Sequence, residues 1–502
     1  MRRKIINWFA ILLLTPIVLF LLLAILLYIP PVQNWAVKQV ASYASGKTGM
    51  DISVDNVHLA FPLDLKIEGF KMIQPNDSLP QVKDTVADVR KLIVDIQAMP
   101  LLKSKVEIDA LEFTDTKVNT TNFIPSARIK GRLGRLYLQS HGIDISKESV
   151  RVNTAKIEQA QIDIALSDTV PPDTTESKAD WKISIDKIDF SATDFTLHLP
   201  GDTMSIHTNM DKAVAKSAYL GLKDGIYKVG TLDWHGGELN YDMNYVAHSK
   251  GFDASHIAMT DIFLGVDSFV FDSPNINMYV RAMQCKEKSG LQIDNFKGHF
   301  AMDSKRISLP DITLKTPYTT LSADFRMDMN AFSDTNPGNL YAQIDGAIGF
   351  QDITKFAPGL PTSLTKNFPR YPIEIKGKAE GNLKYITFKN LNLNIPTSLR
   401  LFANGWMANP TDMERMRMDV KLKGHTGNLA FVTAMLPDDV RKTIRLPQGI
   451  DIDGRIKANR SAYTANLNAG EGGGTLRLIG VIDTKTMRSE ERRVGKECPY
   501  RC

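Results

Sequence analysis

The stretch WKISIDKIDFSATDFTLHL (residues 181–199) decides the fold class, because its apolar side chains follow a strand rhythm that slips twice. A helix would repeat apolar residues every three to four positions, and a regular strand every two. Here the steps are two, three, two, three, two and two, with Thr193 continuing the rhythm of the apolar residues: Ile183, Ile185, Ile188, Phe190, Thr193, Phe195 and Leu197. A step of three turns the next side chain to the opposite face unless a bulge or corner absorbs one residue. Each slip therefore predicts a bend in the strand.

The same slipping rhythm recurs within residues 52–59, 106–118, 150–164 and 307–314. Polar residues such as Glu107 and Asp109 alternate with the apolar ones, which is typical of a sheet with one wet and one dry face. We therefore expect a mainly β fold with few short helices, forming an elongated, repeating antiparallel β-groove. Its apolar inner surface would be built by successive units.

A longer repeat is visible in the C-terminal part. An offset of 77 residues relates the first three of these positions to the last three: Ile373, Ile375, Gly377, Ile450, Ile452 and Gly454. Repeated supersecondary units stack along one axis, because each buries its face only against its neighbours. Short helical pieces near 352–357 and 428–436 are expected to act as caps or plugs between sheet segments.

The N-terminus has the pattern of a membrane signal anchor. Residues 5–29 carry no charge and, as a helix, would reach about 37 Å, more than the roughly 30 Å of a hydrocarbon core. The run is too long for a cleaved signal peptide, and no A-x-A-like site follows it. Positive charge before the span predicts a cytoplasmic N-terminus, with the bulk of the chain across the membrane. The anchor residues are Arg2, Arg3 and Lys4 before the span and the interfacial Trp8 and Tyr28.

These patterns divide the chain into six predicted segments. They are a basic tip and transmembrane anchor (1–31), a short amphipathic helix (32–46), a first β-groove segment (47–200), a second β-groove segment (201–345), two repeats of about 77 residues (346–487) and a non-native tail (488–502). The tail is predicted because RSEERRVGKEC (488–498) resembles the translation of a sequencing adapter. In the helix, Val32, Trp35, Ala36, Val40 and Tyr43 have helical spacing.

Composition excludes several classes of function. The formal net charge is +5, and it falls to about zero without the tail and the three N-terminal charges, so we expect no nucleic-acid partner. Without the tail only Cys285 remains, so no intramolecular disulfide is expected. The sequence contains no HExxH, GxSxG or Walker A motif, and the spacing of His235, His248 and His256 matches no common metal site. We expect a protein that is not an enzyme and that has no cofactor and no metal.

The apolar face is the remaining candidate site. It would be either ordinary core packed against a second sheet or an open groove that accepts acyl chains, and the sequence does not separate the two. The predicted membrane anchor, the repeats and the lack of a catalytic motif in the sequence favour the groove. The residues predicted to line it are Val106, Ile108, Val150, Val152, Ile183, Ile185, Ile188 and Phe190.

Several segments resemble the AsmA-like and TamB-like proteins of Gram-negative bacteria, most closely the TamB-type proteins of Bacteroidetes. They include ASGKTG (44–49), MDISVDNVHLAFPLDLKIEGFKM (50–72), PLLKSKVEIDALEFTDTKV (100–118) and ISLPDITLKTPYTTLSADF (307–325), and the resemblance extends to Met487. It implies an inner-membrane anchor and a periplasmic β-taco, a sheet folded lengthwise around an apolar trough. The C-terminal TamB domain of the family is absent, as expected for a chain truncated at the adapter-like tail.

The resemblance implies a role in outer-membrane biogenesis. The first expectation is conduction of phospholipid along the groove between membranes. The alternative is a scaffold for translocation and assembly of autotransporters and other outer-membrane β-barrels, in which exposed strand edges template client strands. A TamA-type outer-membrane partner would then be engaged through the missing C-terminal region.

Overall fold

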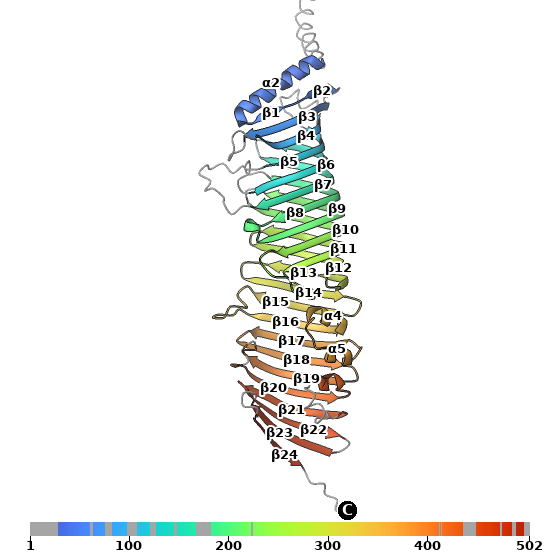
Figure 1. Cartoon of the computed structure of the whole chain (residues 1–502), viewed down its shortest axis with the longest axis vertical. Helices are drawn as coiled ribbons and strands as arrows, with labels where there is room; N and C mark the ends of the chain where they lie inside the picture. Colours follow the sequence, from blue (N-terminus) through green and yellow to red (C-terminus); the bar gives the residue numbers. More distant parts are fainter. Residues whose placement is uncertain are drawn as a thin grey trace, which may run out of the picture. The chain divides into compact units, whose positions relative to one another are not determined.

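A computed structural model of the chain describes residues 29–60, 64–75, 83–97, 108–120, 127–144, 148–166, 182–221, 224–410, 412, 414–434, 448–471, 474–483 and 488–495. Contacts divide the chain into two units, Met1–Ala247 (unit 1) and His248–Cys502 (unit 2). Both are built mainly from antiparallel strands that pair in chain order, and the sheet is not closed (Figure 1). The mainly β, antiparallel fold class is thus confirmed.

Unit 1 begins with a helix and continues as a ladder of strands. Its elements are α2 (Pro30–Thr48), β1 (Asp51–Ser53), β2 (Asn56–Ala60), β3 (Asp64–Pro75), β4 (Lys83–Ile96), β5 (Ile108–Asn119), β6 (Ala127–Asp144), β7 (Ser149–Leu166), β8 (Lys182–His198), the 3-10 turn η2 (Pro200–Asp202), β9 (Met204–Gly221) and β10 (Ile226–Met243). The short strands β1 and β2 both pair with β3, and each later strand pairs with the next.

One pair departs from the expected antiparallel order. Strands β7 and β8 are parallel, with Val152 opposite Ile185 and Ile157 opposite Phe190. A parallel pair requires a connection that returns to the starting end of the first strand. The connecting residues, 167–181, lie outside the described residues. Alternation of apolar residues is the same in parallel and antiparallel strands, so the sequence carried no signal for this reversal.

Several of the predicted slips are corners that run across neighbouring strands of unit 1. At one position on each of eight strands, both members of every pair skip a residue, so the strands bend together without losing register. We call this set the first corner line: Gly69, Arg90, Asp115, Gly134, Gln159, Ala192, Asp211 and Gly236. A second corner line crosses β7 to β10 at Asn153, Asp186, Ser217 and Gly230. The two slips in residues 181–199 fall on these two lines, at Asp186 and Ala192.

Left-handed backbone makes the first corner. In β5, β7 and β8, the corner residues Asp115, Gln159 and Ala192 have φ of 48°, 53° and 47°. Gly69 and Gly236 also have positive φ, of 66° and 75°. Because strands that run in the same direction meet the corner in the same way, the left-handed residues lie on β3, β5, β7, β8 and β10 only. Non-glycine residues pay a steric cost for this conformation, so packing must enforce it.

Unit 2 is also built as a ladder of strands, and its described residues include three short helices. Its elements are β11 (His256–Asp272), β12 (Asn275–Glu287), β13 (Gln292–Met302), β14 (Arg306–Lys315), β15 (Thr320–Asp328), β16 (Leu340–Ile348), α4 (Phe350–Phe356), α5 (Thr362–Asn367), β17 (Ile373–Asn382), β18 (Tyr385–Ile395), β19 (Leu399–Ala408), β20 (Arg417–Thr426), α6 (Ala430–Thr433), β21 (Ile450–Asn459), β22 (Ala462–Glu471), β23 (Gly474–Asp483) and β24 (Arg488–Gly495). Strand β24 falls within the segment predicted to be non-native.

The 77-residue offset corresponds to equivalent strands. Strand β17 starts at Ile373 and β21 at Ile450, and each follows one or two short helices. A Cβ at Gly377 would approach the Leu391 backbone to 3.0 Å, and one at Gly454 would approach that of Leu467 to 2.8 Å. Both repeats therefore use glycine where the neighbouring strand comes close. In β14 the slip between Leu309 and Ile312 is a β-bulge, because the register shifts there against β15.

The helices of unit 2 form an apolar cluster at one end of the strands. Leu364 of α5, Ile395 of β18 and Phe431 of α6 are buried together, and Phe368 stacks on Phe350 with ring centroids 4.0 Å apart. At the start of α4, the buried Asp352 accepts hydrogen bonds from the hydroxyls of Thr316 (2.5 Å) and Thr319 (2.7 Å). This contact ties the helix to the β14–β15 turn.

The predicted anchor, including Arg2, Arg3, Lys4, Trp8 and Tyr28, lies outside the described residues. Among the residues that the structure does describe, no helix combines the length and the apolar character needed to cross a membrane. The helix predicted at 32–46 is present as α2, with wider bounds.

Candidate functional site

Apolar side chains line one face of unit 1 in rows that run from strand to strand. One row crosses nine strands through directly paired residues: Val57, Ile67, Leu92, Phe113, Leu136, Ile157, Phe190, Ala213 and Trp234. A second crosses the same strands: Leu59, Leu65, Val94, Leu111, Leu138, Ala155, Ile188, Ala215 and Leu232. At about 4.8 Å per strand each row is about 38 Å long. We call this surface the apolar face.

The apolar face lies on the inside of the first corner. Ala160 and Thr193, which follow the corner residues of β7 and β8, are each 1% exposed. Gln159 and Ala192, at the corner itself, point to the other face and are exposed. The inner side of the bend is thus closed to solvent at these two strands.

Six of the eight predicted lining residues come together on the parallel strands β7 and β8. Val150 pairs with Ile183 and Val152 with Ile185, while Ile188 and Phe190 continue the same face beyond the second corner. All except the buried Val152 are half-buried. Ile108 is also half-buried, but it lies on β5, where it pairs with Ile96 of β4. Val106 lies outside the described residues.

The sequence reasoning missed the part of the face contributed by β9 and β10. Opposite Ile183, Ile185, Ile188 and Phe190 stand Leu220, Ala218, Ala215 and Ala213 of β9. Strand β10 adds Trp234, which is 5% exposed and donates its indole N–H to the Gly236 carbonyl (2.7 Å). The signal was present, because Ala213, Ala215, Ala218 and Leu220 step by two, three and two. Because alanine has a small side chain, this spacing was not recognised as an apolar face.

Apart from the buried Trp234, the large side chains of the apolar face are only partly buried. Among the described residues of the chain, the largest side chains less than 2% exposed are Val86 and Thr193. A filled sandwich core would be expected to bury isoleucine, leucine and phenylalanine completely. Among the described residues of unit 1, the buried apolar side chains are instead alanine and valine, with Trp234 as the exception.

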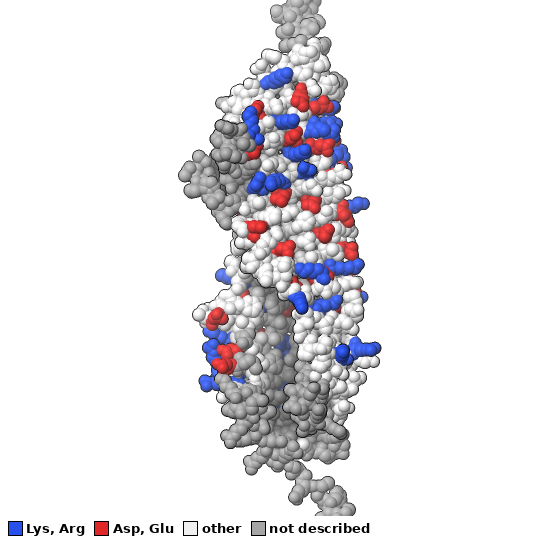
Figure 2. All heavy atoms as spheres, viewed as in Figure 1, with Lys and Arg blue, Asp and Glu red and all other residues white. Residues whose placement is uncertain are grey.

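The opposite face of the strands is polar and carries both signs of charge. Figure 2 shows Lys and Arg interspersed with Asp and Glu across the viewed face of these strands. Arg135 lies between Glu112 (3.2 Å) and Glu158 (3.6 Å), and the two carboxylates raise the pKa of its guanidinium. A shallow hollow of about 410 Å³ on this face is lined by side chains such as Lys117, Arg132 and Asp194. Such mixed polarity is typical of a solvated surface.

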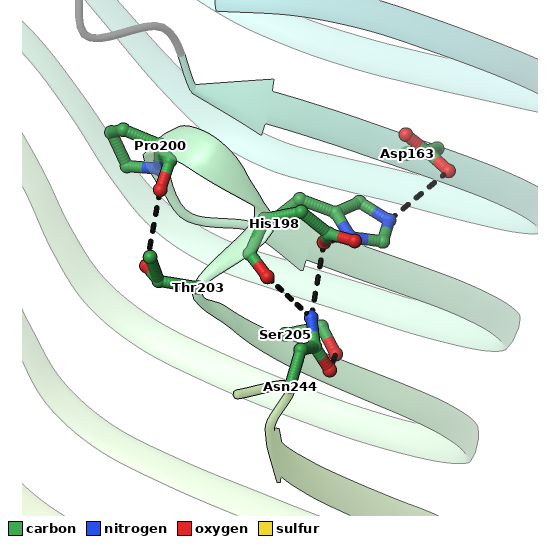
Figure 3. A network of polar contacts seen from close by, with 7 residues as sticks. Asp163, His198, Pro200, Thr203, Ser205 and Asn244 are labelled. Carbon is green, nitrogen blue, oxygen red and sulfur yellow. Dashed lines mark hydrogen bonds and ion pairs between the residues drawn. The ribbon is translucent and has the colours of Figure 1, made fainter. Parts of the chain in front are cut away.

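A polar network closes the turn between β8 and β9 (Figure 3). His198 lies 3.1 Å from Asp202 through Nδ1 and 3.7 Å from Asp163 of β7 through Nε2. Asn244, which follows β10, donates to the backbone carbonyl of Asp202 (2.8 Å) and receives a contact from the Ser205 hydroxyl (3.5 Å). The parallel pairing makes this possible, because it sets the end of β8 beside the end of β7. The network fixes the rim of the apolar face at β8 and β9.

In unit 2, His248, Asp253 and His256 offer ligand atoms within 4.8 Å of one another. Two of them, His248 and His256, are among the three histidines whose sequence spacing matches no common metal site, and Asp253 stands in place of His235. The Asp253 carboxylate already accepts from the backbone N–H groups of Ser249 (2.7 Å) and Ser255 (3.1 Å) and contacts His256 Nδ1 (3.1 Å). The Ser249 N–H is the main reason why the pKa of Asp253 is lowered to about 2. These bonds explain why a carboxylate is buried here, because they hold the 248–256 loop in one conformation.

No protein-family model, curated protein or solved structure matches the chain. The candidate site is therefore described by its own geometry.

Proposed function

We propose that unit 1 binds the acyl chains of phospholipid on its apolar face and conducts them along the rows of paired side chains. The observation that carries this proposal is the continuity of the two rows over nine strands together with the incomplete burial of their large side chains other than Trp234. A half-buried apolar surface of this extent is costly to leave in contact with water. An acyl chain would cover it without requiring any specific polar contact.

In this proposal the chain is an inner-membrane protein of the AsmA-like and TamB-like type, and residues 5–29 anchor it with the bulk in the periplasm. The protein would be non-catalytic and would act in outer-membrane biogenesis. Each row, at about 38 Å, is longer than the roughly 30 Å hydrocarbon core of a bilayer, so a lipid would move from strand to strand instead of occupying one pocket.

The alternative function, a scaffold that adds client strands to a free sheet edge, is less well supported at the N-terminal edge. There the backbone N–H groups of Ile52, Val57 and Leu59 already donate to side chains of α2. An edge with its donors occupied is a poor template for strand addition.

The proposal is tested by lipid content. The full chain is expressed in a Gram-negative host and extracted in a mild detergent, its bound phospholipid is quantified by mass spectrometry, and Ile185→Asp is compared with Ser184→Asp. Ile185 lies on the apolar face, whereas Ser184 pairs with Arg151 on the polar face. We expect wild type and Ser184→Asp to retain lipid tightly, and Ile185→Asp to lose most of it while remaining folded by circular dichroism.

Two results would contradict the proposal. If the folded wild type carries no more lipid than an unrelated single-span protein treated in the same way, the apolar face is ordinary core. If Ile185→Asp unfolds, the milder variants Ile185→Asn and Phe190→Asn are used instead. An unchanged amount of bound lipid in both folded variants would also contradict the proposal.

A further inference from the structure

Helix α2 turns two different faces toward two different surroundings. The face toward the sheet is made of residues four apart: Gln33, Val37, Ala41 and Ser45. Gln33 is 5% and Ala41 9% exposed, and Ser45 accepts a hydrogen bond from the Ile52 N–H (2.9 Å). This face carries polar side chains at Gln33 and Ser45 that bond to the backbone of the edge strands.

The aromatic residues of α2 lie on the side away from the sheet. Trp35 is 64% and Tyr43 69% exposed, whereas an amphipathic helix on a protein core would bury them. At 3.6 residues per turn, Trp35, Val32 and Tyr43 fall within an arc of about 80°. The apolar stripe predicted for this helix is therefore not the face that packs on the protein.

From this arrangement we infer that α2 lies in the interface of the membrane and docks the first strands of unit 1 on the bilayer surface, with Trp35 and Tyr43 at the level of the lipid headgroups. The inference rests on the proposed anchor, because the charge-free run 5–29 ends at Ile29, directly before Pro30, the first residue of α2. No residues lie between this run and α2 that could place the helix away from the membrane surface. Tryptophan and tyrosine favour this interface, since their rings are apolar and their N–H and O–H groups need water or headgroups.

Docking by α2 would also place the two apolar rows at the membrane. The rows begin on β2 at Val57 and Leu59, whose N–H groups donate to Asn34 (2.9 Å) and Gln33 (3.1 Å) of α2. A helix fixed in the interface would hold the start of the apolar face next to the lipids that it is proposed to receive.

The test uses spin labels on the full chain reconstituted in vesicles of phosphatidylethanolamine and phosphatidylglycerol (3:1). Cys498 and Cys502 are replaced by serine, and the buried Cys285 is kept. Single labels are placed at Trp35→Cys and Tyr43→Cys, with Lys38→Cys and Ser191→Cys as exposed controls on another side of α2 and on the polar face. Collision rates with oxygen, which partitions into lipid, and with a water-soluble nickel chelate are measured by paramagnetic resonance.

We expect the ratio of oxygen to nickel collisions at 35 and 43 to exceed that at 38 and 191 at least threefold. Equal ratios at all four positions, with nickel freely accessible, would overturn the inference by placing the helix in water. Low accessibility to both reagents at 35 and 43 would overturn it by showing a protein cover instead. Extraction with alkaline carbonate tests the anchor independently of the docked helix. If the chain stays in the vesicles while the labels at 35 and 43 report water, the anchor proposal stands and only the docking of α2 is overturned.

Discussion

The side chain of Gln33 in α2 pairs with the backbone of Leu59 in β2 as if it were a residue of a neighbouring strand. Its Oε1 accepts from the Leu59 N–H (3.1 Å), and its Nε2 donates to the Leu59 carbonyl (3.4 Å). With Asn34 on Val57 and Ser45 on Ile52, the helix occupies edge groups that another strand would otherwise use. A helix thus terminates the sheet through side-chain amides and a hydroxyl.

Replacing Gln33 by leucine should loosen this edge locally. The loss of one net hydrogen bond, worth about 1 kcal/mol, corresponds to about fivefold faster exchange of the Leu59 amide proton. Hydrogen exchange with residue resolution measures it. Gln39→Leu, on an exposed side of the same helix, is the matched control and should leave Leu59 unchanged. Equal exchange in both variants would show that Gln33 does not cap the strand.

Replacing Ala192 by glycine should stabilise unit 1. Ala192 has φ of 47° on the first corner line, a conformation that costs an L-residue about 1 kcal/mol and glycine almost nothing. The same change at Ala165, in the regular part of β7, should instead lower the free energy of unfolding by about 0.5–1 kcal/mol. Urea denaturation followed by circular dichroism compares the two. Destabilisation of similar size at both sites would mean that the corner imposes no strain.

Removing the Asp352 carboxylate should release α4 from the β14–β15 turn. Asp352→Ala leaves the buried hydroxyls of Thr316 and Thr319 without their acceptor, and hydrogen bonds to a charged group suggest a cost of about 3 kcal/mol. The Gly349 N–H donates to the Thr319 hydroxyl (3.1 Å), so its exchange rate reports the loss directly. Asp334→Ala, at an exposed loop position, should change stability by less than about 0.5 kcal/mol.

Asp253 should make unit 2 sensitive to acid. Its pKa is lowered to about 2 in the folded chain from an ordinary value of 3.8, mainly by the Ser249 N–H and further by Ser255 and His256. The folded state therefore binds a proton less readily than the unfolded state, so this stabilisation is complete above about pH 4 and is lost as the pH falls toward 2. The difference in unfolding free energy between wild type and Asp253→Asn should shrink over that window. A difference that stays constant from pH 6 to pH 2 would contradict the assignment.

The slipping rhythm of residues 181–199 was enough to predict bent strands with one dry face, because side-chain alternation depends only on the local backbone. Its two steps of three, Ile185 to Ile188 and Phe190 to Thr193, contain the two corner residues of β8, Asp186 and Ala192. The 77-residue offset likewise located equivalent strands. These features are local or periodic, and a single chain records them in the spacing of its residues.

Three features were decided only by the tertiary structure. Apolar and polar side chains alternate in the same way in parallel and antiparallel strands, so the sequence could not predict that β7 and β8 are parallel. The small residues Ala213, Ala215 and Ala218 belong to the apolar face because they pair with Phe190, Ile188 and Ile185 of β8, and this depends on neighbouring strands. Helix α2 packs on the sheet edge through Gln33 and Ala41 and leaves Trp35 and Tyr43 exposed. The face toward the edge supplies hydrogen-bond partners for the backbone of the edge strand. The sequence by itself determined where the chain bends and which face is dry, and the tertiary structure determined which strands share that face and what the helix beside it touches.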